Sequence, residues 1–302
     1  MPVIPPRGLD EKLTYPSVGA CIYCYAKYYD ASQPGRRLAL EHIVPEALGG
    51  SLLLPEASCA RCEGITSSFE GTVCRRIFGP LRIHFGMPTK RPKDRPHSLP
   101  VRAFYAGEEE PRRVEVPLSE HPYMCTLVEL DPPLLLGPPQ GGKRVLLTLF
   151  PAGKVVVDRQ MAELCGKLKA ERIEIATTIA TDEFLLMLAK IAHAGCVARF
   201  GIGNFQAFLP DLIRRKDAAG LGLYVGAGED RPPADGTMHH FGVRHLRRGR
   251  QLLAVVEIGL FKAAGLPSYD VVAGRLYEDG PEIHKPSQTG DGKSVVSPFS
   301  VS

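Results

Sequence analysis

Several features that would define a class of protein are missing from this chain of 302 residues. No uncharged apolar run approaches the roughly 20 residues that a membrane-spanning helix needs, so no membrane partner is indicated. The first residues, MPVIPPRGLDEKL, hold prolines and charges where a signal peptide has its apolar segment, and we therefore expect a cytoplasmic protein. No Walker motif or complete dinucleotide glycine motif occurs, because GIGNFQ (201–206) lacks the third glycine.

Charge of neither sign dominates the composition. The 37 Lys and Arg against 33 Asp and Glu give a net charge of +4, and 44% hydrophobic residues suffice for a sizeable core. The length fits one large or two ordinary domains. Positive charge is concentrated between residues 75 and 113 and in HHFGVRHLRRGR (239–250). Such runs are as typical of a solvated surface as of phosphate contact.

The eight cysteines fall into two groups, and a reducing compartment argues against a disulfide framework for either. Four are scattered and read as small buried hydrophobic residues: Cys74, Cys125, Cys165 and Cys196. The other four form CIYC (21–24) and CARC (59–62), and each pair offers half of a tetrahedral zinc site. We expect a structural zinc ion with no open coordination position, held by Cys21, Cys24, Cys59 and Cys62.

The segment between and after the cysteine pairs predicts the order strand, strand, helix. RLALEHIV (37–44) reads as a strand that stops at Pro45, and GGSLLLPEAS (49–58) as a turn and a second strand. From Cys62 onward a helix is expected up to Gly79-Pro80, with an apolar residue at every fourth position: Ile65, Phe69, Val73 and Ile77. An acid–histidine pair, Glu41-His42, then lies on the first strand, and acids lie on the helix.

The stretches CIYC, EHIVPEALGG and ASCARCEG together resemble the HNH, or ββα-metal, endonucleases, in the subset with a structural zinc between two Cys-x-x-Cys pairs. The resemblance covers residues 21–78. It implies an enzyme that hydrolyses phosphodiester bonds of DNA with a catalytic Mg²⁺ or Mn²⁺. The expected fold class is α+β, with an N-terminal zinc-clipped ββα-metal module followed by a mixed α+β domain.

The resemblance also implies roles for individual residues. His42 would be the general base, and Glu41 the first ligand of the catalytic metal. The second ligand in the family is commonly a His or Asn directly after the last cysteine, and here that position is Glu63. Glu70, further along the helix, is the alternative ligand. The middle asparagine of the family is also absent, with Glu56 or Ser58 nearby.

Contacts with the nucleic acid are expected from two basic places. Arg75 and Arg76 lie late on the predicted helix, and Lys90 and Arg91 lie in GMPTKRPKDRPHSLP (86–100), a proline-rich connection. A solvated helix face and a plain linker explain them equally well. Nothing in the sequence separates DNA from RNA as substrate, because no residue is identified that would read a 2′-hydroxyl.

Two questions stay open at this point. The alternative to an enzyme is a non-catalytic, zinc-stabilised module that binds nucleic acid or protein. The oligomeric state is also open: one site cuts one strand, so a double-strand break would need a homodimer or two events.

The predicted domains are a nuclease module (1–85), the basic linker (86–100), an α+β domain without an assigned role (101–285) and a polar, disordered tail (286–302). Within the second domain, KRVLLTLF and GKVVVD (143–158) predict a hairpin around PAG. A helix is expected from a Thr181-Asp182 cap to Gly201. Four apolar stretches between residues 221 and 277 predict a sheet, with RGRQ (248–251) as a turn.

Overall fold

The computed structural model describes residues 12–33, 35–87, 89, 91–122, 124–138, 146–149, 154–229, 238–277 and 287–288. Helices and strands alternate along these ranges, which confirms the mixed α+β class. None of the described helices is both long and apolar enough to cross a membrane. Lys90 and the predicted tail lie outside the described residues, except that Ser287–Gln288 forms a short strand, β14.

The predicted order strand, strand, helix is confirmed in the N-terminal part. Strand β2 (Ala39–His42) pairs antiparallel with β3 (Leu52–Ser58), and the chain then enters α1 (Ala60–Thr72). A further strand, β1 (Leu13–Thr14), runs parallel to β3, so the small sheet has the order β14-β1-β3-β2. A short 3₁₀ turn, Glu46–Leu48, connects β2 with β3.

The helix ends directly before Gly79-Pro80, as expected, after a π-helical turn, Val73–Ile77. A separate short helix, α2 (Gly79–His84), begins after a bend at Phe78. Pro80 lies in the first turn of α2, where a backbone N–H would have no helical partner in any case. The proline therefore begins a new helical segment.

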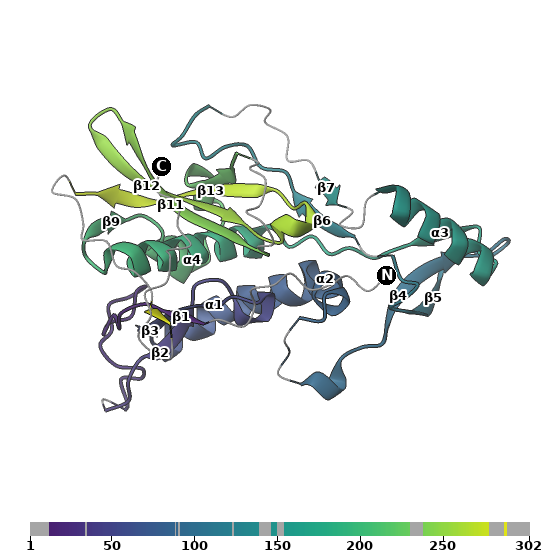
Figure 1. The fold of residues 1–302 in the computed structure, drawn as a ribbon, viewed down its shortest axis with the longest axis horizontal. Helices are drawn as coiled ribbons and strands as arrows, with labels where there is room; N and C mark the ends of the chain where they lie inside the picture. The colour runs from purple at the N-terminus through teal and green to yellow at the C-terminus, as the bar shows by residue number, and fades with distance from the viewer. Residues whose placement is uncertain are drawn as a thin grey trace.

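The helix α4 (Thr181–Phe200) is the centre of the molecule, and its bounds match the prediction. Ala180, not Thr181, holds the N-cap position, and it makes no side-chain cap bond. Every residue from Phe184 to Phe200 is buried, because α4 packs against α1 on one side and against the strands β12 and β13 on the other (Figure 1). Gly195 permits this packing: a Cβ at this position would lie 2.0 Å from the ring of Phe241.

The sheet above α4 is antiparallel, with the order β10-β13-β12-β11. Its strands are β10 (Val225–Ala227), β11 (His240–Arg248), β12 (Gln251–Gly259) and β13 (Ser268–Leu276). A further strand, β9 (Phe205–Ala207), pairs with β13, and α5 (Pro210–Arg215) follows it. The predicted turn at RGRQ is confirmed, because Arg248 pairs with Gln251. Short 3₁₀ turns lie at Gly220–Leu223 and Lys262–Ala264.

A smaller unit lies at the far end of the molecule (Figure 1). Strands β4 (Ser98–Phe104), β5 (Arg112–Pro117) and β8 (Arg172–Glu174) form a sheet, and α3 (Lys154–Leu168) packs on it. A separate pair, β6 (Cys125–Val128) and β7 (Leu146–Leu149), is antiparallel. A 3₁₀ turn, Pro92–Asp94, precedes β4.

The prediction of a second strand at GKVVVD was wrong, because Lys154–Asp158 is the first turn of α3. Val157, Met161 and Leu164 recur at helical spacing; Val157 is buried, and Met161 and Leu164 pack on the β4-β5-β8 sheet. An i,i+4 ion pair between Lys154 and Asp158, at 2.5 Å, also suits a helix. The helical stripe prevails over the strand preference of three consecutive valines. The PAG turn itself lies outside the described residues.

One hydrophobic core joins the N-terminal part to α4 and the large sheet. Buried side chains from both parts form one contiguous cluster, which includes Cys21, Leu81 and Leu276. Phe78, after the π-helical turn, lies 5.2 Å from Phe261 and 6.1 Å from Phe184, ring centre to ring centre. This core therefore contains residues from both sides of the predicted linker, 86–100. The β4-β5-β8 unit has a small core of its own.

Candidate metal centre and acidic cleft

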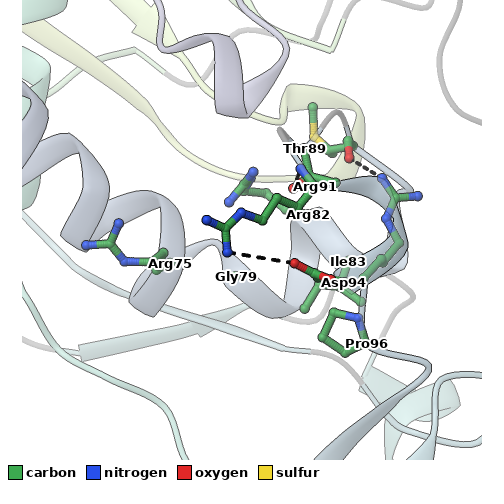
Figure 2. Close-up of a pocket in the computed structure, with 10 residues that line it drawn as sticks. Arg75, Gly79, Arg82, Ile83, Thr89, Arg91, Asp94 and Pro96 are labelled. Atoms are coloured by element: carbon green, nitrogen blue, oxygen red, sulfur yellow. Dashed lines mark hydrogen bonds and ion pairs between the residues drawn. The ribbon is translucent and has the colours of Figure 1, made fainter.

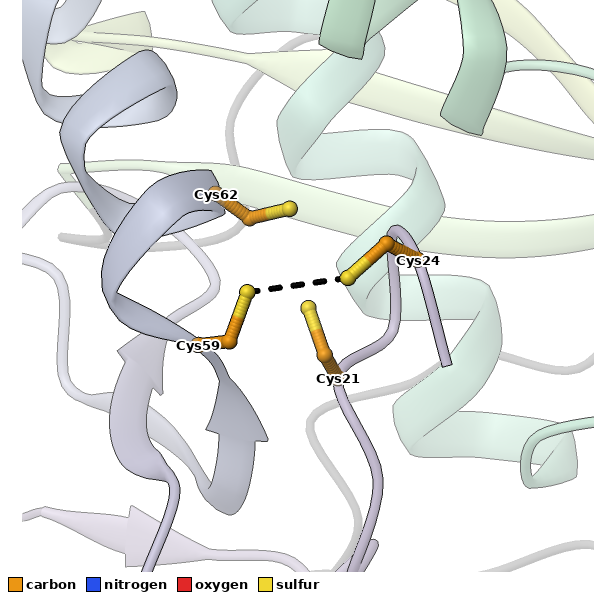
Figure 3. Close-up of side chains that lie close together, drawn as sticks. All are labelled: Cys21, Cys24, Cys59 and Cys62. Carbon is orange, nitrogen blue, oxygen red and sulfur yellow. Dashed lines mark hydrogen bonds between the residues drawn. The ribbon is translucent and has the colours of Figure 1, made fainter. Parts of the chain in front are cut away.

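The four cysteines predicted to bind zinc lie together. Their sulfur atoms are all within 4.8 Å of one another, and Cys24 Sγ lies 3.6 Å from Cys59 Sγ (Figure 3). A tetrahedral zinc ion with bonds of about 2.3 Å would hold its sulfur ligands roughly 3.8 Å apart. Cys21, Cys59 and Cys62 are buried and Cys24 is half-buried. The donor set and the spacing therefore suit a metal ion such as zinc.

Backbone geometry brings the two pairs together. The first pair lies on a tight turn, in which Cys21 N–H donates to Ala26 and Tyr25 adopts a left-handed conformation with φ 63°. The second pair lies at the start of α1, with Cys59 at the N-cap and Cys62 in the first turn. Ile22 N–H donates to Ala57 of β3 at 2.8 Å, which fixes the first turn against the strand that leads to the second.

The electrostatics of the cysteine cluster favour a cation. A hydrogen bond from Cys62 lowers the pKa of Cys21 to about 5, against the effect of burial. The same interaction raises the pKa of Cys62. One thiolate can thus be held by its neighbours, but four negative sulfurs at this spacing repel one another, so all four become thiolates only around a positive ion.

The acid of the Glu41-His42 pair lies in a second cluster, around Lys190 of α4. Lys190 Nζ lies 2.6 Å from Glu41 Oε1 and 2.8 Å from Glu70 Oε1. The ammonium group also donates to the backbone carbonyl of His42. Lys190 is 1% exposed, and Glu41 is buried as well. We call Glu41, Glu70 and Lys190 the buried ion cluster.

Lys190 is charged in this setting. Burial opposes the charge, but the two carboxylates outweigh it and raise the pKa of Lys190. Burial also raises the pKa of Glu70, although Lys190 counteracts this shift. The pKa of the fully buried Tyr23 is raised by burial and further by the negative charge of both clusters, at Glu41, Glu70, Cys21 and Cys62.

His42 is half-buried at the end of β2, beside these acids. Burial lowers its pKa, so the imidazole is neutral at pH 7. The Nε2 atom is enclosed and has no hydrogen-bond partner among the described residues. A buried, unpaired ring nitrogen is uncommon and costs free energy, which suits a group whose partner arrives with a ligand. The turn after β2 requires glycine at position 50, because a Cβ there would lie 1.9 Å from the carbonyl oxygen of Val44.

Most of the predicted catalytic and metal-binding residues outside the cysteine cluster line one cleft of about 600 Å³, which we call the acidic cleft. Four of its lining residues are Glu41, His42, Glu63 and Glu70, and Lys190 lies at its base. Glu63 is the exposed member, and its carboxylate accepts a hydrogen bond from the Tyr29 hydroxyl at 2.8 Å. The two candidates for the missing asparagine, Glu56 and Ser58, do not line it.

The arginines predicted to contact phosphate do not all line the same cavity. Arg75 lines the acidic cleft, whereas Arg76 does not. Arg91 lies in an adjacent cavity, which Arg75 also lines. Both Arg75 and Arg91 are exposed.

The sequence prediction missed three charged residues of the cleft: Lys190, Arg82 and Glu46. Lys190 lies 148 residues after His42 and reads as one polar interruption of an apolar helix. A charged residue flanked by MLA and IAHA is the one available signal, because a lysine on a buried helix needs a partner. Arg82, near the end of α2, carries no signal that distinguishes it from a surface arginine.

Comparison with known proteins adds no relative. A scan against protein-family models, a search of curated proteins and a search of solved structures found no match to this chain.

Proposed function

We propose that the protein is a metal-dependent endonuclease that hydrolyses phosphodiester bonds of DNA in the acidic cleft. The observation that carries the proposal is the composition of that cleft: a neutral histidine, carboxylates from β2 and α1, and arginines share one space of about 600 Å³ next to the four-cysteine cluster. The order of β2, β3 and α1 supports an HNH-like arrangement.

Each group has a part in this reaction. His42 would take the proton of the attacking water, since a neutral imidazole is the side chain best matched to that step near pH 7. Glu63 and Glu41 would hold a Mg²⁺ or Mn²⁺ ion, which prefers oxygen ligands. When bound, that ion supplies positive charge at the phosphate and the leaving oxygen. Arg75, at the cleft wall, would pair with a phosphate oxygen.

Lys190 competes with a divalent ion for two of the carboxylates, Glu41 and Glu70. Lys190 already neutralises part of the charge of Glu41 and Glu70, at 2.6 and 2.8 Å. Glu63, at the open side of the cleft, would therefore be the main ligand of a divalent ion, and Glu41 the second ligand. Glu70 is the weaker candidate, because burial raises its pKa and favours its neutral form.

The proposal is tested by nicking of supercoiled plasmid in the presence of Mg²⁺ or Mn²⁺. The wild type is expected to convert the plasmid, and His42→Ala, at equal zinc content, to be slower by about 10²–10⁴-fold, the usual share of a general base. His97→Ala is the matched control, since His97 is exposed and does not line the cleft. Equal cleavage by wild type and His42→Ala would refute the role of His42.

A second function is supported by one observation, the ammonium group of Lys190 between two carboxylates. A fixed cation at that point weakens the attraction of a divalent ion, which fits a zinc-stabilised module that binds nucleic acid without cutting it. Calorimetry with Mn²⁺ on zinc-loaded protein separates the two functions. The enzyme requires a weak second site that Glu63→Gln removes, and the binding module has none.

A further inference from the structure

A cavity of about 610 Å³ lies beside the acidic cleft and is rich in arginine (Figure 2). Among the described residues, four arginines and one acid, Asp94, line it, so these residues give the lining a formal charge of +3. The arginines are Arg75, Arg82, Arg91 and Arg95. We call this space the arginine cavity. Arg75, Arg82 and Thr89 line both it and the acidic cleft, so the two are continuous.

Two of the arginines are held in place by the backbone. Arg82 donates from Nε to the carbonyl of Ala47 at 2.5 Å, and from a terminal nitrogen to that of Cys74 at 3.1 Å. Arg95 donates to the carbonyl of Gly86 at 3.1 Å and to that of Met87. These hydrogen bonds order the guanidinium groups before any ligand arrives.

The other two arginines are exposed and have room to move. The guanidinium of Arg75 lies over Gly71, where an added Cβ would come within 2.9 Å of it. Arg91 is 84% exposed at its side chain and lies 3.9 Å from Asp94. Arg75 comes from the π-helical turn and Arg91 from the segment after α2, and in Figure 2 the guanidinium of Arg75 is turned away from those of Arg82 and Arg91.

The gathering of like charges is unfavourable without an anion. Burial lowers the pKa of Arg82, and the positive charges of Arg95 and Arg75 lower it further. Asp94 is the only acid among the described residues that line the cavity, and it is exposed. A phosphate group, with its several acceptor oxygens, matches the forked geometry of guanidinium groups and would offset the repulsion.

We propose that the arginine cavity binds a backbone phosphate of the nucleic acid strand whose reacting phosphate lies in the acidic cleft. The inference rests on the proposed function, since it takes the acidic cleft as the place of reaction. Arg75, shared by both spaces, would contact the strand between the two phosphates.

The test measures binding without cleavage. Full-length, zinc-loaded protein carrying His42→Ala is titrated into a fluorescently labelled DNA duplex at several KCl concentrations, and anisotropy is recorded. Adding Arg75→Ala or Arg91→Ala is expected to weaken binding about tenfold and to reduce the slope of log K against log salt by about 0.9 for each phosphate that the protein no longer neutralises. Arg159→Ala, an exposed helical arginine on α3, is the control for a simple loss of charge.

The outcomes separate this inference from the nuclease proposal. A weakening no greater than that of Arg159→Ala, or no binding at low salt, would overturn the arginine cavity as a nucleic acid site. Tight binding of inorganic phosphate that depends on Arg75, with unchanged DNA affinity, would assign the cavity to a free anion and also overturn it. If Arg75→Ala and Arg91→Ala weaken binding while wild-type protein nicks no plasmid, the arginine cavity is supported as a nucleic acid site and the nuclease proposal fails.

Discussion

The four-cysteine cluster and the buried ion cluster differ in where their positive charge comes from. The first brings four cysteine thiols together, and the second brings two carboxylates, Glu41 and Glu70, to one ammonium group. At the cysteines, the cation has to come from solution. At Glu41 and Glu70 it is the ammonium group of Lys190, which is part of the chain.

The difference has a physical consequence for each site. A metal ion held by the four cysteines would exchange with the solution, so the occupancy of the cysteine cluster would depend on metal supply and on pH. Lys190 cannot leave, and its partners are positioned even when no ion is bound. The chain thus offers a site for an external cation at the cysteine cluster and has an internal cation, Lys190, at the base of the cleft.

Loss of the external cation is expected to have the largest effect. Cys59→Ser should reduce zinc content from one ion per chain to near zero and remove cooperative unfolding of the N-terminal part. The apparent binding free energy of a structural zinc, about 10–16 kcal/mol, is as large as the net stability of a domain. Elemental analysis and thermal unfolding check this. Cys165→Ser, outside the cluster, is the control, and equal zinc content in both variants would contradict a metal role for Cys59.

Loss of the internal cation ranks second. Lys190→Met leaves two carboxylates without their partner, and we expect the free energy of unfolding to fall by about 3–5 kcal/mol. Urea denaturation measures the change, and adding Glu41→Gln and Glu70→Gln should restore part of it. The control is Lys167→Met, which removes an exposed ion pair with Glu120 and should cost less than about 1 kcal/mol.

The pH dependence of that variant sharpens the comparison. Because burial raises the pKa of Glu70 above its ordinary 4.5, the folded state holds a proton that the unfolded state releases, and stability falls as pH rises from 4.5 through the folded pKa. Lys190 opposes this shift. The fall should therefore be steeper in Lys190→Met than in the wild type, and parallel curves would show that Lys190 does not neutralise Glu70.

The smallest expected effect on stability comes from the titration of His42, whose backbone carbonyl accepts a hydrogen bond from Lys190. Burial lowers its pKa below 6.5, so the unfolded state binds the extra proton, and stability rises with pH through the folded pKa up to 6.5. An NMR titration of the ring protons in zinc-loaded protein, without added Mg²⁺ or Mn²⁺, should give a midpoint below 6.5. If nicking uses His42 as base, its rate should rise with the same midpoint. A midpoint at or above 6.5 would contradict the neutral imidazole.

The sequence predicted the local parts of these sites well. Two Cys-x-x-Cys pairs, the strand that carries Glu41-His42 and the helix that carries Glu63 and Glu70 are all set by short-range spacing. The same rules failed at GKVVVD, where helical packing on the β4-β5-β8 sheet prevails over β-branched residues. Lys190 could not be assigned, because only the packing of α4 on α1 brings it to His42. The arginine cavity also depends on the fold, since it needs the π-helical turn and α2 to place Arg75 beside Arg82.

The path of α4 through the core has a practical consequence for fragment expression. A fragment that ends in the proline-rich connection near residue 90 contains every residue of the CIYC–EHIVPEALGG–ASCARCEG pattern and looks like a complete minimal unit. It would lack Lys190, leave Glu41 and Glu70 facing each other without a counter-charge, and expose the face of α1 that α4 covers. An inactive or aggregating fragment of this kind would report on the missing helix and would say nothing about the chemistry of the cleft.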